Sequence, residues 1–365
     1  MMTDSSTLVP RTLLCSPLRP ETAQQRKLIA VESTQRKTLG EVLCCEFGFR
    51  VLVPDIRGHG RSRPASSPSS SGLDWSYDDI VLDTGAFIEL AERIDPCAPV
   101  ALVGHSLCGH TFPAYLGMAS SLSWSSSSSS APSSPTVIDN QQQTKLLSNL
   151  RYDQQLSQHA DAVLVHSKHA DRVKAVVSIA GNTWQQRHCA SRRRWFVKLA
   201  SCYVALVILW TVGRYPTSWF RRNATDEAFT YFSQTLMTFV RNEWKHRGSG
   251  WDYNEGLKRI RCPFLHLLSE RDVLTCNPED ALLFSATIPT REALLLSSTS
   301  EEKREKPQGG NRIVVLRSET QPPDHMQLVT SPELSLAAWR WLGTWLSLRL
   351  SASPPPSPAL VAARF

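Results

Sequence analysis

The chain lacks several signals that would assign it to common classes of protein. None of its nine cysteines forms a Cys-x-x-Cys pair, so no zinc-binding spacing is present. An odd number of scattered cysteines is typical of free thiols in a reducing compartment. The opening stretch MMTDSSTLVPRTLL has no basic segment followed by a sustained apolar core, so we expect no secretory signal. These absences favour a cytoplasmic protein without a structural metal.

Basic side chains outnumber acidic ones, giving a net charge of +7, but the pattern of a nucleic-acid-binding surface is missing. Arginines cluster at 192–194 and 221–222, and no aromatic side chains alternate with them along a single stripe. We therefore predict no nucleic-acid partner. The charge fits contact with an anionic membrane surface better.

What the sequence does contain is a regular alternation of short apolar runs and helical patterns over 365 residues. This alternation predicts an α/β fold, with a mostly parallel sheet flanked by helices. The expected strands are 49–54, 99–103, 172–179, 263–268 and 313–316. The expected helices are 77–94, 107–118, 279–287 and 334–348, and a polar loop is expected over 289–308.

Changes in composition divide the chain into seven segments. Residues 1–46 are an atypical or truncated N-terminal region, and residues 47–118 form the first part of the core. A Ser- and Gln-rich low-complexity insertion follows at 119–169, because such a composition cannot bury a core. The remaining segments are a core strand (170–181), a helical cap (182–257), the second part of the core (258–348) and a disordered tail (349–365).

The stretch VGHSLCGH (103–110) lies between an expected strand and an expected helix. A serine at such a sharp turn is typical of a nucleophile elbow, which needs small residues two positions away on either side. Gly104 meets this need, whereas Cys108 stands where the usual G-x-S-x-G pattern has its second glycine. An incidental serine in a Gly-rich turn is the alternative interpretation.

A nucleophilic serine needs a base, and the base needs an acid that orients it. Asp272 directly follows the expected strand 263–268, at the edge where open α/β sheets carry their sites. His325 lies on a loop after a later strand. We predict the triad Ser106, Asp272 and His325. The alternatives are Glu270 as a competing acid, Asp272 as a loop cap and His325 as a solvated surface residue.

Four segments carry a family resemblance: FGFRVLVPDIRGHGRS (47–62), VALVGHSLCGH (100–110), RCPFLHLLSERD (261–272) and DHMQLVTSPELSLAAWRWL (324–342). Together they resemble the α/β-hydrolase superfamily of serine hydrolases, from about Phe47 to Leu348. The resemblance implies an α/β-hydrolase fold with a helical cap. It also implies that the backbone N–H of Leu107 is one donor of the oxyanion hole. For His105, which precedes the serine, we expect packing in the turn rather than catalysis.

One part of the family pattern is missing. The family usually has a His-Gly segment between its third strand and first helix, where a backbone N–H supplies half of the oxyanion hole. Here the chain before Phe47 offers only KLIAV (27–31), ESTQRK and a shortened helix in LGEVLCCEF. Either Glu32-Ser33-Thr34 replace the loop, or the segment is absent through deletion or a faulty gene model. Losing one such donor typically lowers the rate by about 10²–10³-fold.

The most apolar window is Leu199–Val212, which has basic residues on both sides. It is shorter than the roughly 20 residues of a spanning helix. Three interpretations stay open: a cap helix packed over the active site, which we favour, an interfacial helix on a membrane, and a true span. We therefore keep contact with a membrane surface through residues 195–222 as an expectation. A cap would place apolar walls near Ser106 and favour hydrophobic substrates.

The combined prediction is a serine hydrolase that cleaves a carboxylic ester, with a small-molecule or lipid ester as substrate and no metal or organic cofactor. Ser106 attacks the carbonyl, His325 transfers the proton, and Asp272 orients His325. Acyl transfer to an alcohol or thiol would use the same residues. A catalytically impaired, membrane-associated binding protein is the alternative that Cys108 and the missing segment motivate. A serine at position 106 argues against chemistry that resembles that of aspartate-nucleophile epoxide and haloalkane hydrolases.

Overall fold

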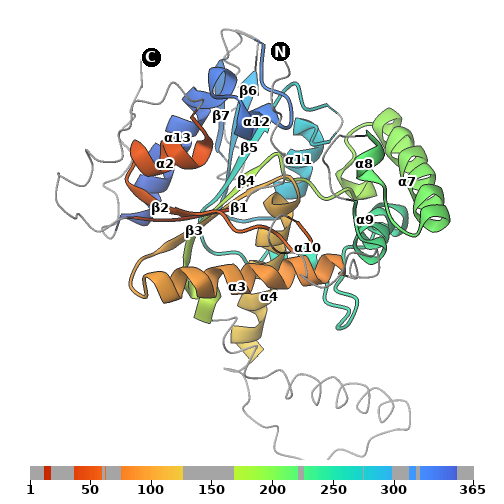
Figure 1. Cartoon of the computed structure of the whole chain (residues 1–365), viewed down its shortest axis with the longest axis horizontal. Coiled ribbons are helices and arrows are strands. Elements are labelled where there is room, and N and C mark those ends of the chain that lie inside the picture. The colour runs from red at the N-terminus through yellow and green to blue at the C-terminus, as the bar shows by residue number, and fades with distance from the viewer. Residues whose placement is uncertain are drawn as a thin grey trace, which may run out of the picture.

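The structure is a computed structural model that describes residues 12–17, 37–59, 62, 75–125, 168–220, 226–273, 275–297, 312–317 and 321–351. Seven strands among these residues form one sheet in the order β2-β1-β3-β4-β5-β6-β7 (Figure 1). The strands from β3 to β7 are parallel to one another, whereas β1 is antiparallel to both β2 and β3. The predicted mostly parallel sheet is confirmed. The strands are β1 (Thr12–Pro17), β2 (Phe49–Leu52), β3 (Val100–His105), β4 (Val173–Ile179), β5 (Phe264–Ser269), β6 (Arg291–Ser297) and β7 (Arg312–Arg317).

Helices cover both faces of this sheet (Figure 1). On one face lie α3 (Tyr77–Ile94) and α4 (Leu107–Ser125), and on the other lie α2 (Leu39–Cys45) and α13 (Pro332–Leu350). Between β4 and β5 the described chain is mostly helical, as expected for residues 182–257. Its elements are the 3₁₀ turn η2 (Gln186–His188) and the helices α7 (Arg192–Val212), α8 (Thr217–Phe220), α9 (Phe229–Arg241) and α10 (Tyr253–Leu257). Two further helices, α11 (Pro278–Ser285) and α12 (Gln327–Thr330), follow β5 and β7.

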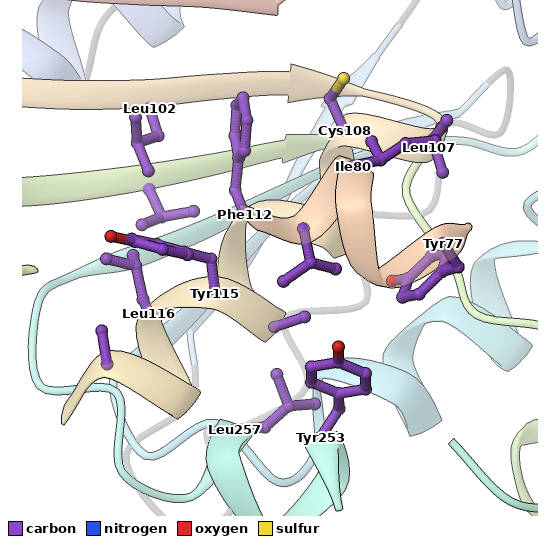
Figure 2. Packing of buried hydrophobic residues seen from close by; sticks show 14 of the residues in the cluster. Tyr77, Ile80, Leu102, Leu107, Cys108, Phe112, Tyr115, Leu116, Tyr253 and Leu257 are labelled. Carbon is purple, nitrogen blue, oxygen red and sulfur yellow. The ribbon is translucent and has the colours of Figure 1, made fainter. Parts of the chain in front are cut away.

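Successive side chains of β3 belong to two different hydrophobic cores, one on each face of the sheet. Val100 and Leu102 belong to the core under α3 and α4, whereas Ala101 and Val103 belong to the core under α2 and α13. Successive side chains of a strand point to opposite faces, so a strand covered on both sides reads as a continuous apolar run. Figure 2 shows the first of these cores, with Leu102 near aromatic side chains of α4. The nucleophile elbow is therefore built at the end of a fully buried strand.

Helix α3 begins with a reciprocal side-chain cap between Ser76 and Asp79. The Ser76 side chain accepts a hydrogen bond from the backbone N–H of Asp79, and the Asp79 side chain accepts one from the backbone N–H of Ser76. This reciprocal capping box satisfies two N–H groups that no turn of the helix can reach. Helix α4 continues past the expected end to Ser125, with Pro113 inside it.

Two strands were not expected from the sequence. The polar loop predicted over 289–308 is wrong in its first part, because REALLLS forms β6 and pairs with β5 and β7 along its length. The short run Thr12–Pro17 forms β1 inside the region expected to be atypical. The low-complexity insertion from 126 to 167, the tail from 352 and the segment 27–34 lie outside the described residues.

Candidate active site

Ser106 occupies a strained turn between β3 and α4. Its backbone φ is 53°, in the left-handed region that few residues other than glycine adopt. The turn is held by two backbone hydrogen bonds: the Ser106 N–H donates to the Ile179 carbonyl (2.9 Å), and the Gly109 N–H donates to the Ser106 carbonyl (3.0 Å). The strand, strained serine and helix form the elbow geometry that the sequence predicted.

The structure explains how the elbow tolerates a cysteine at position 108. A Cβ on Gly104 would lie 2.4 Å from the Cys108 carbonyl oxygen, so the glycine before the serine is required. The Cys108 side chain, by contrast, is 1 % exposed and belongs to the apolar core on the α4 side of the sheet (Figure 2). The close approach of helix and sheet occurs one residue later, where a Cβ on Gly109 would lie 2.7 Å from the Cα of Gly181.

Asp272 lies three residues after the end of β5 and is buried. Its Oδ1 accepts backbone N–H bonds from Thr275 (3.2 Å) and Cys276 (3.0 Å), which fixes the carboxylate. Its Oδ2 lies 2.5 Å from His325 Nδ1. Glu270, the competing acid, instead accepts a hydrogen bond from the Ser297 hydroxyl (2.7 Å).

His325 joins the acid to the serine. Its Nδ1 faces the Asp272 carboxylate, which can only accept, so this nitrogen carries the proton of the neutral ring. Its Nε2, 2.9 Å from Ser106 Oγ, is then free to accept the hydroxyl proton. The structure thus brings together Ser106, Asp272 and His325, the three residues predicted to form the triad, with hydrogen-bonded neighbours in the required order.

The loop that carries His325 is fixed on both sides. Asp324 Oδ1 accepts the backbone N–H groups of Met326 (3.0 Å) and Gln327 (2.8 Å), and the Gln327 side chain accepts the Asp324 N–H in return (2.9 Å). The buried Ser269 hydroxyl donates to the Pro323 carbonyl (2.5 Å). The Ser269–Pro323 hydrogen bond joins the loop that carries His325 to the end of β5, and Asp272 lies on the loop that follows the same strand.

His105 contacts the loop that carries His325. Its Nε2 lies 2.9 Å from the backbone carbonyl of His325, and the two rings are 4.8 Å apart. Because a carbonyl only accepts, this nitrogen carries the ring proton. Burial lowers the pKa of His105 to about 3, which keeps the ring neutral. The packing role expected for His105 therefore includes a specific hydrogen bond, which the sequence did not indicate.

The oxyanion hole is the least complete part of the site. Leu107 is the first residue of α4, so its N–H has no partner within the helix and lies at the positive end of the helix dipole. On the side of β3 away from β4 lies β1, which runs antiparallel, with Thr12 opposite Gly104 and Cys15 opposite Ala101. Its last residue, Pro17, is therefore at the rim of the sheet away from Ser106. The C-terminal end of β1 therefore supplies no second oxyanion donor near Ser106.

Comparison with known families agrees with the fold and the elbow. A model of the family described as serine aminopeptidase, S33 (Hydrolase_4) matches residues 38–153, about a third of the chain, including β2, β3 and Ser106. Taken with the mostly parallel sheet and the elbow, this match indicates the class of protein: the described residues have an α/β-hydrolase fold, and the part of the chain around Ser106 is similar to serine hydrolases of that family.

Solved structures of hydrolases are similar to the chain at low sequence identity. An esterase from Thermogutta terrifontis is 12 % identical, with a TM-score of 0.40 over 87 % of this chain and 88 % of that one. A monoacylglycerol lipase from Paleococcus ferrophilus is 14 % identical, with a TM-score of 0.41 over 84 % and 86 %. An enol-lactonase from Burkholderia xenovorans is 13 % identical, with a TM-score of 0.40 over 85 % of each chain. No curated protein matches the sequence significantly.

Proposed function

We propose that the chain hydrolyses carboxylic esters, with Ser106 as nucleophile, His325 as general base and acid, and Asp272 as the group that orients His325. The observation that carries this proposal is the hydrogen-bonded series from Asp272 Oδ2 to His325 Nδ1 and from His325 Nε2 to Ser106 Oγ. The left-handed backbone of Ser106 supports it, because such strain is concentrated at functional sites.

The chemistry follows from these positions. Ser106 Oγ attacks the ester carbonyl carbon while its proton passes to His325 Nε2, and Asp272 stabilises the imidazolium that forms. The tetrahedral oxyanion is stabilised by the Leu107 N–H and the N-terminus of α4. When the C–O bond breaks, the leaving alkoxide takes the proton from His325. Water then attacks the acyl-serine, giving its proton to His325, and the carboxylic acid leaves as Ser106 recovers its hydrogen.

A fluorophosphonate probe, which phosphonylates activated serines, tests this assignment. We expect the wild-type chain to be labelled and to hydrolyse a p-nitrophenyl ester, and the Ser106→Ala variant to lose both activities, by up to about 10⁶-fold in kcat. Ser249→Ala, which changes an exposed serine, is the matched control and should retain both. Near-UV circular dichroism checks that each variant is folded. Unchanged labelling of Ser106→Ala would overturn the proposed nucleophile.

A lipid ester is the substrate class that we propose within this activity. Its support is the large apolar surface of the segment between β4 and β5, which includes exposed aromatic side chains on α7 and α8. We expect kcat/KM to rise with acyl length in a series of p-nitrophenyl esters. A maximum at the acetate would contradict the lipid ester and leave the ester hydrolase intact.

One observation favours an enzyme that is less active than a serine hydrolase with two oxyanion donors. Because β1 runs antiparallel to β3, its C-terminal end lies away from Ser106 and supplies no second oxyanion donor there. If folded wild-type chain is neither labelled nor active, the impaired, membrane-associated binding protein becomes the better assignment.

A further inference from the structure

Helix α7 presents an apolar face to solvent. Six side chains on this face are between 48 % and 73 % exposed: Phe196, Val197, Tyr203, Val204, Val207 and Trp210. Contiguous exposed apolar surface on a folded protein marks an interaction site for a protein or a membrane. We propose that this face, the α7 face, docks on a lipid bilayer that contains anionic lipids.

The opposite side of α7 already has its partners, so the exposed face is not a core face that failed to pack. Lys198, Cys202, Ala205 and Leu209 recur at spacings of four and three residues and are buried. Cys202 and Ala205 share a small core with residues of α9. At 100° per residue, the six exposed side chains lie on the other side of the helix from these four. The orientation of α7 is therefore fixed by its buried side.

The charges around the α7 face fit an anionic surface. Arg192 and Arg193 are exposed in the first turn, and neither forms an ion pair with the described residues. Cations are unfavourable at a helix N-terminus, so the helix itself does not explain them. Arg194, in contrast, pairs with Glu279 and Asp280. Helix α7 contains no acidic residue, so nothing on it would repel anionic lipid headgroups.

Two tryptophans favour a membrane over a protein partner. Trp210 is 73 % exposed near the end of α7, and Trp219 is 66 % exposed on the short α8 that follows. Tryptophan is enriched at the membrane–water interface, where its ring is apolar and its N–H is hydrated. An apolar face with exposed tryptophans and basic residues at its edge is the composition of an interfacial helix.

The contacts between α7 and the rest of the protein favour docking on the bilayer surface over insertion across it. Among the described residues, α7 is the one helix long and apolar enough to cross a membrane. To span, it would have to separate the buried Lys198 Nζ from Asp280 Oδ2, which lie 2.8 Å apart. Breaking a buried ion pair leaves both charges without compensation. The α7 face therefore lies on the bilayer surface while the helix stays attached to α11.

This attachment also relates the α7 face to the proposed site. The Trp184 Nε1–H donates to the Thr275 carbonyl (3.2 Å), and the Ala190 N–H donates to Asp280 Oδ1 (2.9 Å). Both acceptors belong to the segment that follows Asp272. The stretch that leads into α7 is therefore hydrogen-bonded to the segment that follows Asp272. The docking itself does not depend on the proposed hydrolysis.

Flotation with vesicles tests the proposal, using phosphatidylcholine alone and phosphatidylcholine mixed with phosphatidylserine. We expect the folded wild-type chain and Ser106→Ala to float with the mixed vesicles. The double variant Val204→Glu/Val207→Glu should lose binding, whereas Leu348→Glu, which changes an equally exposed apolar residue on α13, should bind as the wild type does. Arg192→Ala and Arg193→Ala should each weaken binding to the mixed vesicles by about fivefold.

The outcomes that would overturn docking are equally specific. One is failure of the folded wild-type chain to bind either vesicle. Another is equal loss in Leu348→Glu and in the Val204→Glu/Val207→Glu variant. Self-association that the double variant abolishes, without vesicle binding, would assign the α7 face to a second copy of the chain. Because Ser106→Ala is expected to bind, failure of the docking proposal is distinguishable from failure of the proposed function.

Discussion

His325 Nε2 lies 2.9 Å from Ser106 Oγ, although 219 positions of sequence separate the two residues. Ser106 follows β3, and His325 lies on the loop between β7 and α12. Parallel strands bring their carboxyl ends to one rim, so residues that follow different strands can meet there. The contact between His325 and Ser106 is therefore a consequence of the sheet order.

Asp272 is expected to matter through the orientation of His325. Asp272→Asn replaces the acceptor that faces Nδ1 with an amide and favours the wrong tautomer, so we expect kcat to fall by about 10⁴-fold. Glu270→Gln is the matched control, because Glu270 bonds to Ser297 rather than to His325. Steady-state kinetics of both variants provide the measurement. Equal losses in the two variants would refute the assignment of Asp272.

His105 is expected to act as a positioning residue. His105→Phe removes the hydrogen bond to the His325 carbonyl and should lower kcat by about 10- to 100-fold, with KM little changed, because small displacements of a catalytic group are costly. His105→Gln keeps an N–H donor and should recover part of the loss. If the two variants lose stability equally and kcat not at all, the hydrogen bond has only a structural role.

The buried pair Lys198–Asp280 is expected to attach α7 to the core. The two side chains are 4 % and 0 % exposed. Asp280→Leu leaves the Lys198 ammonium buried without its partner, so we expect the free energy of unfolding to fall by about 3–5 kcal/mol. The double variant Lys198→Met/Asp280→Leu should recover part of this loss, because no buried ammonium remains unpaired and Arg194 keeps Glu279, whereas the Ala190 N–H still loses its acceptor. Urea unfolding measures both, and a cost for Asp280→Leu below about 1 kcal/mol would contradict the prediction.

Stability is expected to fall as the pH is lowered below about 6.5, the ordinary pKa of histidine. Burial lowers the pKa of His105 and His110 to about 3, and that of His188 and His266 to about 4. Between pH 6.5 and these values the unfolded chain binds protons that the folded chain does not, so acid favours unfolding. Each histidine contributes a slope of up to about 1.4 kcal/mol per pH unit.

Urea unfolding between pH 8 and pH 5 measures this slope. The variant His266→Leu removes one of the four titrating rings, so the slope of the unfolding free energy against pH should fall by up to about 1.4 kcal/mol per pH unit. A free energy of unfolding that stays constant between pH 7 and pH 5 would show that these rings are not held neutral.

The sequence predicted most of the sheet because its central strands are buried on both faces. The runs at β3, β4 and β5 are continuous apolar segments, and α3 has apolar residues at helical spacing with acidic residues at its start. Strand β6 was missed because REALLLS carries two charged residues before three leucines, next to a polar segment. Strand β1 was missed because six residues carry too little periodicity to separate a strand from a loop.

At the candidate site, too, the sequence revealed the features that have a local pattern and missed those that depend on contacts between distant residues. The elbow is a local pattern, so G-x-S-x-C-G could be found in the sequence, and the order of serine, acid and histidine indicated Asp272 and His325. The hydrogen bond from His105 to the His325 carbonyl joins residues 220 positions apart and has no local signal. The absence of a His-Gly loop was visible in the sequence. The direction of the strand beside the elbow was not, because strand direction depends on pairing between distant residues.

The sequence by itself determined the class of the fold and indicated Ser106, Asp272 and His325 as the candidate triad, because both depend on local patterns and on their order along the chain. Only the tertiary structure decided that β1 runs antiparallel and that α7 turns six apolar side chains outward. Helix α7 is apolar on both sides, so its sequence has no period that reveals which side is buried. The orientation is held by tertiary contacts of the buried side: the Lys198–Asp280 ion pair with α11 and the small core that Cys202 and Ala205 share with α9.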